Sequence, residues 1–193
     1  AAWLVDEAHG PHFPFIFKDK SALTYKADIV VHSTHKMMNS FTQTALMHCS
    51  RKELAREAKQ ALNMLQSSSP SYLLMSSLDA LQAQMQESGS ELWQRTSALA
   101  GYLSEEIRKI GAYRLWQDEL TGWWIDPCKI VISAEPLGLD GLQMADILRE
   151  KYQIDVELCT KGYVLLLVTM GHQEKDCLHL LSALKKIKEE FAG

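Results

Sequence analysis

With 193 residues, 47% of them hydrophobic and 23% charged, the chain has the composition of an ordinary folded protein rather than of a disordered one. Its formal net charge of −4 offers no basic surface to a phosphate backbone, so we expect no nucleic-acid partner. No apolar run approaches the roughly 18 residues of a membrane span, and the cysteines form no CxxC pair, so we expect a cytoplasmic protein with reduced thiols.

Two short apolar strands open the chain, and a polar segment follows each of them directly. Residues 2–5 predict a buried strand that runs into Asp6-Glu7-Ala8-His9-Gly10. Residues 28–32 predict a second strand, which runs into Ser33-Thr34-His35-Lys36. Because ligands of an α/β sheet bind beyond the carboxyl ends of its strands, we expect both polar segments at one edge of a sheet.

The middle of the chain has apolar residues at helical spacing. This spacing indicates helices over residues 51–65, 71–86 and 91–110. The sequence Ser67-Ser68-Ser69-Pro70 ends the first of them, and Gly111 fits a C-cap for the third.

Beyond Gly111 the pattern changes to short strands and helices in alternation. The predicted strands are residues 129–132 and 162–169, and the predicted helices are residues 141–151 and 174–191. We therefore predict two domains: residues 1–110, in which the 91–110 helix is a bridge, and a small α+β domain over residues 111–193.

The two polar segments contain the groups that an aldehyde cofactor with a pyridine ring and a phosphate would need. A lysine that forms an imine must be held near the aldehyde carbon, and Lys36 beside His35 is a candidate. A carboxylate beside the ring nitrogen keeps the ring protonated, and Asp6 at a strand end is suited to that role. Ser33 and His35 could bind the phosphate.

Four stretches of the chain also match a known pattern. They are Val5 to Gly10, Ala27 to Val31, Ser33 to Lys36 with Thr42-Gln43 and His48, and Ser69 to Met75 with Ser77-Leu78-Asp79. In these stretches the chain closely resembles the bacterial ornithine/lysine/arginine decarboxylases. The resemblance extends over essentially the whole chain and is densest in its first part.

The resemblance implies pyridoxal 5'-phosphate as the cofactor and an α/β fold of the aspartate-aminotransferase type, fold type I. This chain would be the C-terminal part of the large domain, followed by the small α+β domain. Position by position, Lys36 resembles the Schiff-base lysine and Asp6 the partner of the pyridinium nitrogen. Ala8 resembles the small residue under the ring, and His9 a catalytic residue beside it.

Ser33 and His35 resemble the phosphate ligands of the family. In dimers of this fold a hydroxyl before a Ser-Pro turn often reaches the phosphate of the neighbouring subunit, and Ser68 or Ser69 is similar. The resemblance thus implies a homo-oligomer, a dimer or higher. The family chain is much longer than this one, so we expect a fragment that needs an N-terminal half.

The activity that the resemblance implies is decarboxylation of a basic L-amino acid, namely arginine, lysine or ornithine, to an amine of polyamine metabolism. The residues leave three alternatives open. The chain is an inactive fragment or assembly module of the same fold, or it catalyses another reaction of the cofactor such as transamination. Asp6 to His9 also matches a DEAH-type ATPase motif, although the chain has no GxxxxGK[S/T] loop.

The spacing of the pairs His9/His12 and His32/His35 is compatible with metal ligands. On strand ends and loops, however, a three-residue spacing does not bring two side chains to one face as it does on a helix. We therefore expect no metal site.

Overall fold

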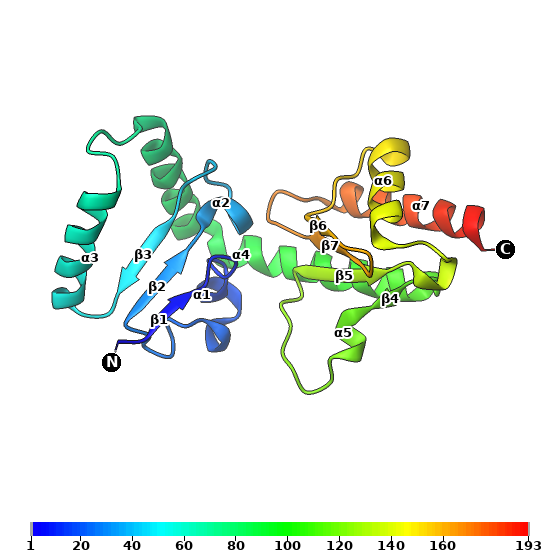
Figure 1. Cartoon of the computed structure of the whole chain (residues 1–193), viewed down its shortest axis with the longest axis horizontal. Helices are drawn as coiled ribbons and strands as arrows, with labels where there is room; N and C mark the ends of the chain where they lie inside the picture. The colour runs from blue at the N-terminus through cyan, green and yellow to red at the C-terminus, as the bar shows by residue number, and fades with distance from the viewer. Residues whose placement is uncertain (1, 193) are drawn as a thin grey trace. The chain divides into compact units, whose positions relative to one another are not determined.

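The computed structural model describes residues 2–192. The chain divides into two compact units, Ala1–Gln94 and Arg95–Gly193 (Figure 1). The division lies inside the helix α4 (Tyr72–Ile110), so each unit contains one part of this helix. The domain boundary that we predict at residue 110 lies at the end of the same helix and stays a prediction.

The first unit contains a three-stranded sheet in the order β1-β2-β3 (Figure 1). Strands β1 (Leu4–Asp6) and β2 (Ile29–His32) are parallel, with Asp6 opposite Val31. They confirm the two predicted strands to within two residues at each end. Strand β3 (Leu46–Cys49) pairs antiparallel with β2 and was not predicted, because its short apolar run is half exposed and resembles a loop.

The two faces of this sheet have different surroundings. Val5 and Val30 lie opposite each other and face a small core formed with Ala22, Leu23 and Ala27. Side chains alternate along a strand, so Leu4 and Asp6 face the other side, where Leu4 is 65% exposed. Helix α3 (Lys52–Leu65) follows β3 and confirms the predicted helix over 51–65. The short elements α1 (Phe13–Ile16), η1 (Lys18–Lys20) and α2 (Thr34–Met37) complete the unit.

The prediction of two separate helices over 71–86 and 91–110 was wrong, because α4 is continuous from Tyr72 to Ile110. The polar segment between them contains no proline, and Ser88 Oγ donates to Gln84 O within the helix instead of capping a new one. Gly89 does not break the helix either. A Cβ atom there would lie 2.9 Å from Phe15 Cδ1, so the glycine allows α1 to approach α4 closely.

The second unit contains a four-stranded antiparallel sheet in the order β4-β5-β7-β6. Its strands are β4 (Arg114–Leu115), β5 (Lys129–Ser133), β6 (Leu158–Cys159) and β7 (Val164–Leu167). Its other elements are α5 (Trp116–Glu119), η2 (Glu135–Leu137), α6 (Gly141–Tyr152) and α7 (Glu174–Phe191). Strands β5 and β7 and helices α6 and α7 confirm the four elements predicted for this region.

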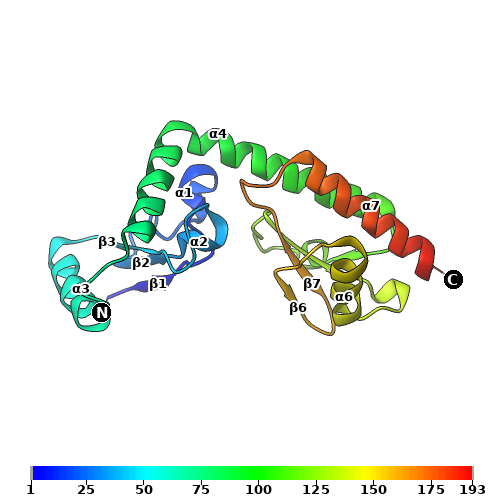
Figure 2. The ribbon, with the colours of Figure 1, turned by 90° about the horizontal axis from the view of Figure 1, so that it is seen from above.

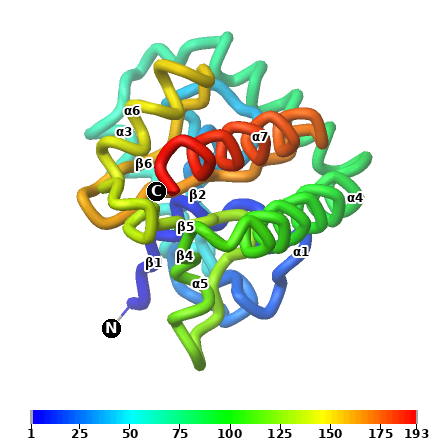
Figure 3. The backbone as a smooth tube through the Cα atoms, turned by 90° about the vertical axis from the view of Figure 1, so that its right-hand side faces the viewer, coloured from blue at the N-terminus to red at the C-terminus, as the bar shows by residue number. Residues whose placement is uncertain are grey.

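Helix α7 lies beside the part of α4 that belongs to the second unit (Figures 2 and 3). The two helices are joined by polar contacts as well as by apolar packing. Tyr113 Oη donates to Leu184 O over 2.7 Å, and Lys188 Nζ donates to Ile110 O over 2.6 Å. Gly111 follows α4 with a φ of 70°, which confirms the predicted C-cap.

The larger hydrophobic core of the protein lies in this second unit. It is formed by buried side chains of α4, β5, α6, β7 and α7, such as Ile107, Ile132, Met144, Val164 and Leu184. Among residues 2–192, no helix is both long and apolar enough to cross a lipid bilayer.

Candidate active site

The segments that follow β1 and β2 are hydrogen-bonded to each other. Glu7 N donates to Val31 O over 3.0 Å, and Ser33 N donates to Ala8 O over 3.2 Å. These bonds continue the parallel pairing past the ends of both strands. The two polar segments, which are far apart in the sequence, therefore lie side by side at one edge of the sheet, as we expected from the strand order.

Asp6 is the last residue of β1 and its side chain is exposed. Its Oδ1 accepts a hydrogen bond from Ala8 N over 3.0 Å, which fixes the orientation of the carboxylate. Within residues 2–192, its Oδ2 accepts no hydrogen bond and Asp6 forms no ion pair. One carboxylate oxygen is thus held in place while the other can accept a proton or a hydrogen bond.

Lys36 lies in the short helix α2, which begins one residue after Ser33. Its side chain is exposed, although Thr34, Met37 and Met38 on both sides of it are buried. In the part of the chain that the structure describes, Lys36 forms no ion pair. The backbone is therefore anchored around this lysine, and the amine itself stays available.

Ser33 and His35 have polar atoms that the fold leaves available. Ser33 is the N-cap residue of α2, but its side chain makes no capping hydrogen bond. His35 Nδ1 lies 2.7 Å from Thr44 O. Because a carbonyl oxygen can only accept, Nδ1 must carry the hydrogen, and Nε2 is left for another partner.

Ala8 and His9 are half-buried in the turn that follows β1. The turn ends at Gly10, where an added Cβ atom would lie only 2.9 Å from the ring of Phe13 and would also collide with Glu7. A larger residue at position 10 would therefore change the path of the segment that carries Asp6, Ala8 and His9.

Sequence reasoning did not identify the buried polar pair beneath this edge. Glu7 Oε2 lies 2.7 Å from His32 Nε2, and the two side chains are only 10% and 3% exposed. Glu7 also accepts hydrogen bonds from Ala22 N over 2.8 Å and from Ser21 Oγ over 3.2 Å. The pair joins the end of β1 to the end of β2. The sequence signal that could have identified this pair is its position, since Glu7 directly follows Asp6 and His32 directly precedes Ser33.

A third residue extends this pair to strand β3. The ring of His48 packs edge-on against the ring of His32, with ring centroids 4.8 Å apart. Burial lowers the pKa of His48, nearby His32 lowers it further, and Glu7 opposes the shift. His48 therefore favours its neutral form.

A cavity of about 760 Å³ lies in the first unit, and its wall is mainly apolar. Residues of β2, β3 and α4 line it, including His32, His48, Leu81 and Met85. None of the six residues that we predict for the site belongs to this wall. Thr34 and Met38 do belong to it, so the cavity adjoins the segment that carries Lys36.

Comparisons with known proteins identify relatives along nearly the whole chain. Residues 1–176 match the family described as Orn/Lys/Arg decarboxylase, major domain. The chain is 33% identical to the arginine decarboxylase of Bacillus cereus over 97% of its own length and 42% of that protein. It thus spans less than half the length of this curated relative.

Solved structures show the same fold at lower identity. The lysine decarboxylase of Francisella novicida superposes with a TM-score of 0.82 at 22% identity, over 96% of this chain and 32% of that one. The alanine–glyoxylate aminotransferase of a Nostoc species superposes with a TM-score of 0.71 at 20% identity, over 97% and 54% of the two chains. With its fold of the pyridoxal-phosphate enzymes of type I, and with the family matched from residue 1 to residue 176, the chain belongs to the Orn/Lys/Arg decarboxylase family.

Proposed function

We propose that this chain supplies the cofactor-anchoring part of a pyridoxal-phosphate-dependent decarboxylase of basic L-amino acids. The observation that carries the proposal is the hydrogen-bonded pairing of the two segments beyond β1 and β2, with Asp6 on one and Lys36 on the other. A carboxylate and an amine from neighbouring strand ends are the two groups that such a cofactor requires at its opposite ends.

The groups available at this edge fit pyridoxal phosphate. Asp6 has one carboxylate oxygen free to accept a hydrogen bond from a pyridinium N–H, and Lys36 has an unpaired amine for the aldehyde. Ser33 Oγ and His35 Nε2 are suited to the phosphate, and Ala8 has no side chain large enough to obstruct a ring. When bound, the cofactor supplies an electron sink for the bond that joins the substrate to its carboxylate.

The residues of the chain then have separate tasks. Asp6 keeps the ring nitrogen protonated, since a nearby negative charge favours the charged form of the ring. Lys36 would hold the cofactor through its amine and, as a free amine, would be available for release of the product. His9, half-buried in the turn after β1, is placed to lie beside the ring.

The substrate we propose is arginine, lysine or ornithine, and the product an amine of polyamine metabolism. The name of the Bacillus cereus relative favours arginine, and the name of the Francisella structure favours lysine. We also propose a cytoplasmic location, because Cys49, Cys128, Cys159 and Cys177 are all free thiols.

We further propose that the chain acts together with an N-terminal half of the protein. β1 is an edge strand of three residues, and on its outer side the described residues provide no partner strand. A further strand beside β1 would pair the open backbone groups on that side.

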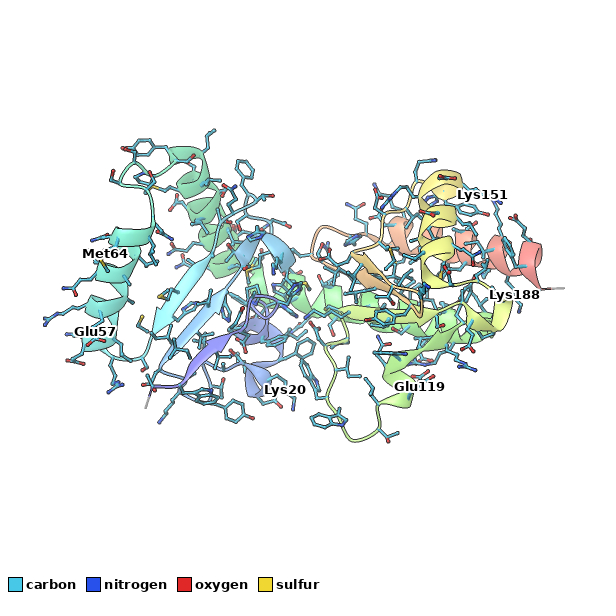
Figure 4. The ribbon with its side chains drawn as sticks, in the orientation of Figure 1. Lys20, Glu57, Met64, Glu119, Lys151 and Lys188 are labelled. Carbon is cyan, nitrogen blue, oxygen red and sulfur yellow. The ribbon has the colours of Figure 1, made fainter. Side chains whose placement is uncertain are left out.

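A homodimer or higher oligomer is also part of the proposal. Large apolar side chains are exposed between the end of α3 and the start of α4, namely Met64, Leu65, Tyr72 and Leu73. Met64 is on the outer surface of α3 in Figure 4. Several exposed large apolar side chains in one stretch of the chain are typical of a protein interface, and Ser68 and Ser69 lie between them in the sequence.

The test is to mix the protein with pyridoxal phosphate, with and without an N-terminal half, and to record the visible spectrum. Reduction with borohydride followed by peptide mass spectrometry then identifies the modified lysine. We expect the cofactor on Lys36, and its loss in Lys36→Ala but not in Lys59→Ala, which replaces an exposed lysine of α3.

A spectrum without a cofactor band in both samples would contradict the proposal and favour an inactive assembly module. Decarboxylation is separated from transamination by measuring carbon dioxide release and keto-acid formation with the same basic amino acids. This measurement is needed because decarboxylases and an aminotransferase share the fold.

A further inference from the structure

The segment that carries Lys36 is closed by three buried hydroxyl groups, those of Thr34, Ser40 and Thr44, which we call the hydroxyl cluster. Ser40 Oγ lies 2.7 Å from Thr34 Oγ1, Thr44 Oγ1 lies 2.6 Å from Ser40 Oγ, and Thr34 Oγ1 lies 3.1 Å from Thr44 Oγ1. The three hydroxyl oxygens thus form a closed ring in which each lies within hydrogen-bonding distance of the other two. Their residues are 0%, 8% and 4% exposed.

Every hydroxyl in the hydroxyl cluster can donate and accept at the same time. Each hydroxyl has one hydrogen: Ser40 donates to Thr34, Thr34 donates to Thr44, and Thr44 donates to Phe41 O, which as a carbonyl oxygen can only accept. A chain of hydrogen bonds that all run in one direction is mutually strengthened, and it leaves no buried donor unsatisfied. Such a fully satisfied buried network favours one conformation of the segment.

Thr44 is also the residue that orients His35. Its backbone oxygen accepts from His35 Nδ1 over 2.7 Å and also lies 3.2 Å from Thr34 Oγ1. Its hydroxyl lies 2.6 Å from Phe41 O. Thr44 therefore connects His35, the proposed phosphate ligand, to both Thr34 and Phe41.

The cluster fixes the backbone on both sides of Lys36 without touching the lysine. Met37 and Met38 are buried next to it, at 0% and 8% exposure, and Phe41 N donates to Ser77 Oγ of α4 over 3.2 Å. Between Thr34 and Ser40, only Lys36 and Asn39 are exposed. Buried contacts thus hold the backbone of this segment, while the amine of Lys36 is left available.

We propose that Ser40 and Thr44 are positioning residues, which hold Lys36 and His35 in the geometry that binds the cofactor through a closed ring of buried hydroxyls. The proposal rests on the proposed function of Lys36. It predicts that the hydroxyl of Thr44 matters for the affinity and spectrum of the bound cofactor, although the side chain of Thr44 is buried.

The test compares Thr44→Val, which keeps the shape of the side chain and removes the hydroxyl, with Thr44→Ser, which keeps the hydroxyl. Thr42→Val is the matched control, because Thr42 is exposed in the same segment and outside the cluster. The three variants are studied with or without the N-terminal half, according to which of these two samples of the wild-type protein binds the cofactor. Two quantities are measured: the dissociation constant for pyridoxal phosphate, and the pH at which the absorbance of the bound cofactor changes.

We expect Thr44→Val to weaken cofactor binding roughly fivefold, the equivalent of one hydrogen bond, and to shift the pH of the absorbance change. Thr44→Ser and Thr42→Val should give wild-type values. Without cofactor, Thr44→Val should also exchange the amide hydrogens of residues 36–43 faster than Thr42→Val does. Ser40→Ala, which opens the ring at another member, should reproduce the result and replaces Thr44→Val if that variant does not fold.

Equal affinities and equal absorbance transitions in Thr44→Val and Thr42→Val would overturn the inference. So would a Thr44→Ser variant that is as impaired as Thr44→Val, because the hydroxyl would then be irrelevant. A wild-type protein that binds no cofactor in either sample would instead refute the proposed function, and this inference with it. The two failures are therefore distinguishable.

Discussion

At the scale of single residues, the site depends on polar groups that the fold holds beneath it. The buried contact between Glu7 and His32 joins the two strand ends that carry Asp6 and Ser33. Removing His32 would take one hydrogen bond from the buried carboxylate of Glu7, and losing such a buried partner costs about 1–3 kcal/mol. The alignment of the two segments therefore has a structural basis that is independent of the cofactor.

The lowered pKa of His48 predicts how stability depends on pH. Burial, with help from His32, lowers the pKa of His48 below its ordinary value of 6.5. Between the lowered pKa and 6.5, the unfolded chain binds more protons than the folded chain. The contribution of neutral His48 to stability is therefore complete above 6.5 and is lost as the pH falls through this window.

We expect the urea concentration at the midpoint of unfolding to decrease when the pH is lowered from 7 to 5, and to decrease less in His48→Gln than in the wild-type protein. His179→Gln, which replaces an exposed histidine, should lose as much stability over this pH range as the wild-type protein does. If His48→Gln and wild-type protein lost stability equally over this range, the buried ring would not be the cause.

At the scale of elements, the sequence predicted those whose pattern is local. Strands β1 and β2, helices α3, α6 and α7, and the C-cap at Gly111 all have their apolar spacing or turn residue in a single stretch. The resemblance to the decarboxylases selected Asp6 and Lys36 from that same local pattern. Their roles remain predictions, although the strand order that brings their segments together is observed.

Features that depend on contacts between distant segments could not be predicted in this way. Glu7 contacts His32 because of the register of two strands, and Thr44 belongs to the site because its backbone oxygen meets His35. The continuity of α4 was missed for the same reason. Gly89 looks like a helix breaker until the contact with Phe15 is known.

The two glycines inside α4 make this explanation testable. Gly101 has no other atom within 4 Å of an added Cβ, so Gly101→Ala should stabilise the protein by up to about 1 kcal/mol through helix propensity. Gly89→Ala has the same propensity gain, but its Cβ would lie 2.9 Å from Phe15. We therefore expect Gly89→Ala to give no increase in stability, or a decrease, in urea denaturation. A stabilisation equal to that of Gly101→Ala would show that the glycine at position 89 has no packing role.

At the scale of the whole molecule, the protein has two units, each with its own core. The core of the second unit encloses Cys177, which is 4% exposed, whereas Cys159 at the edge of the same unit is half-buried. Burial, together with the nearby Asp176 and Glu174, raises the pKa of Cys177 to about 11. The reactive thiolate of Cys177 is therefore scarce at neutral pH as well as shielded.

We expect a maleimide to label Cys159 quickly and Cys177 only when the core of the second unit opens. The labelling rate of Cys177 should rise steeply at the urea concentration at which that unit unfolds, while the rate for Cys159 changes little. The triple variant Cys49→Ser/Cys128→Ser/Cys159→Ser provides a protein in which the labelling of Cys177 is measured alone. Rapid labelling of Cys177 in the folded protein would contradict the closed core.

The pairing of Ser33 N with Ala8 O has a consequence for the stretch of chain between them. The two segments are held by strand pairing, and the connection between them includes both buried residues, such as Ser21 and Ala22, and the exposed Tyr25, which is 61% exposed. A peptide-bond cleavage beside Tyr25 would leave the strand pairing in register. The alignment of the two segments is thus a property of β-sheet adjacency and does not require an unbroken polypeptide.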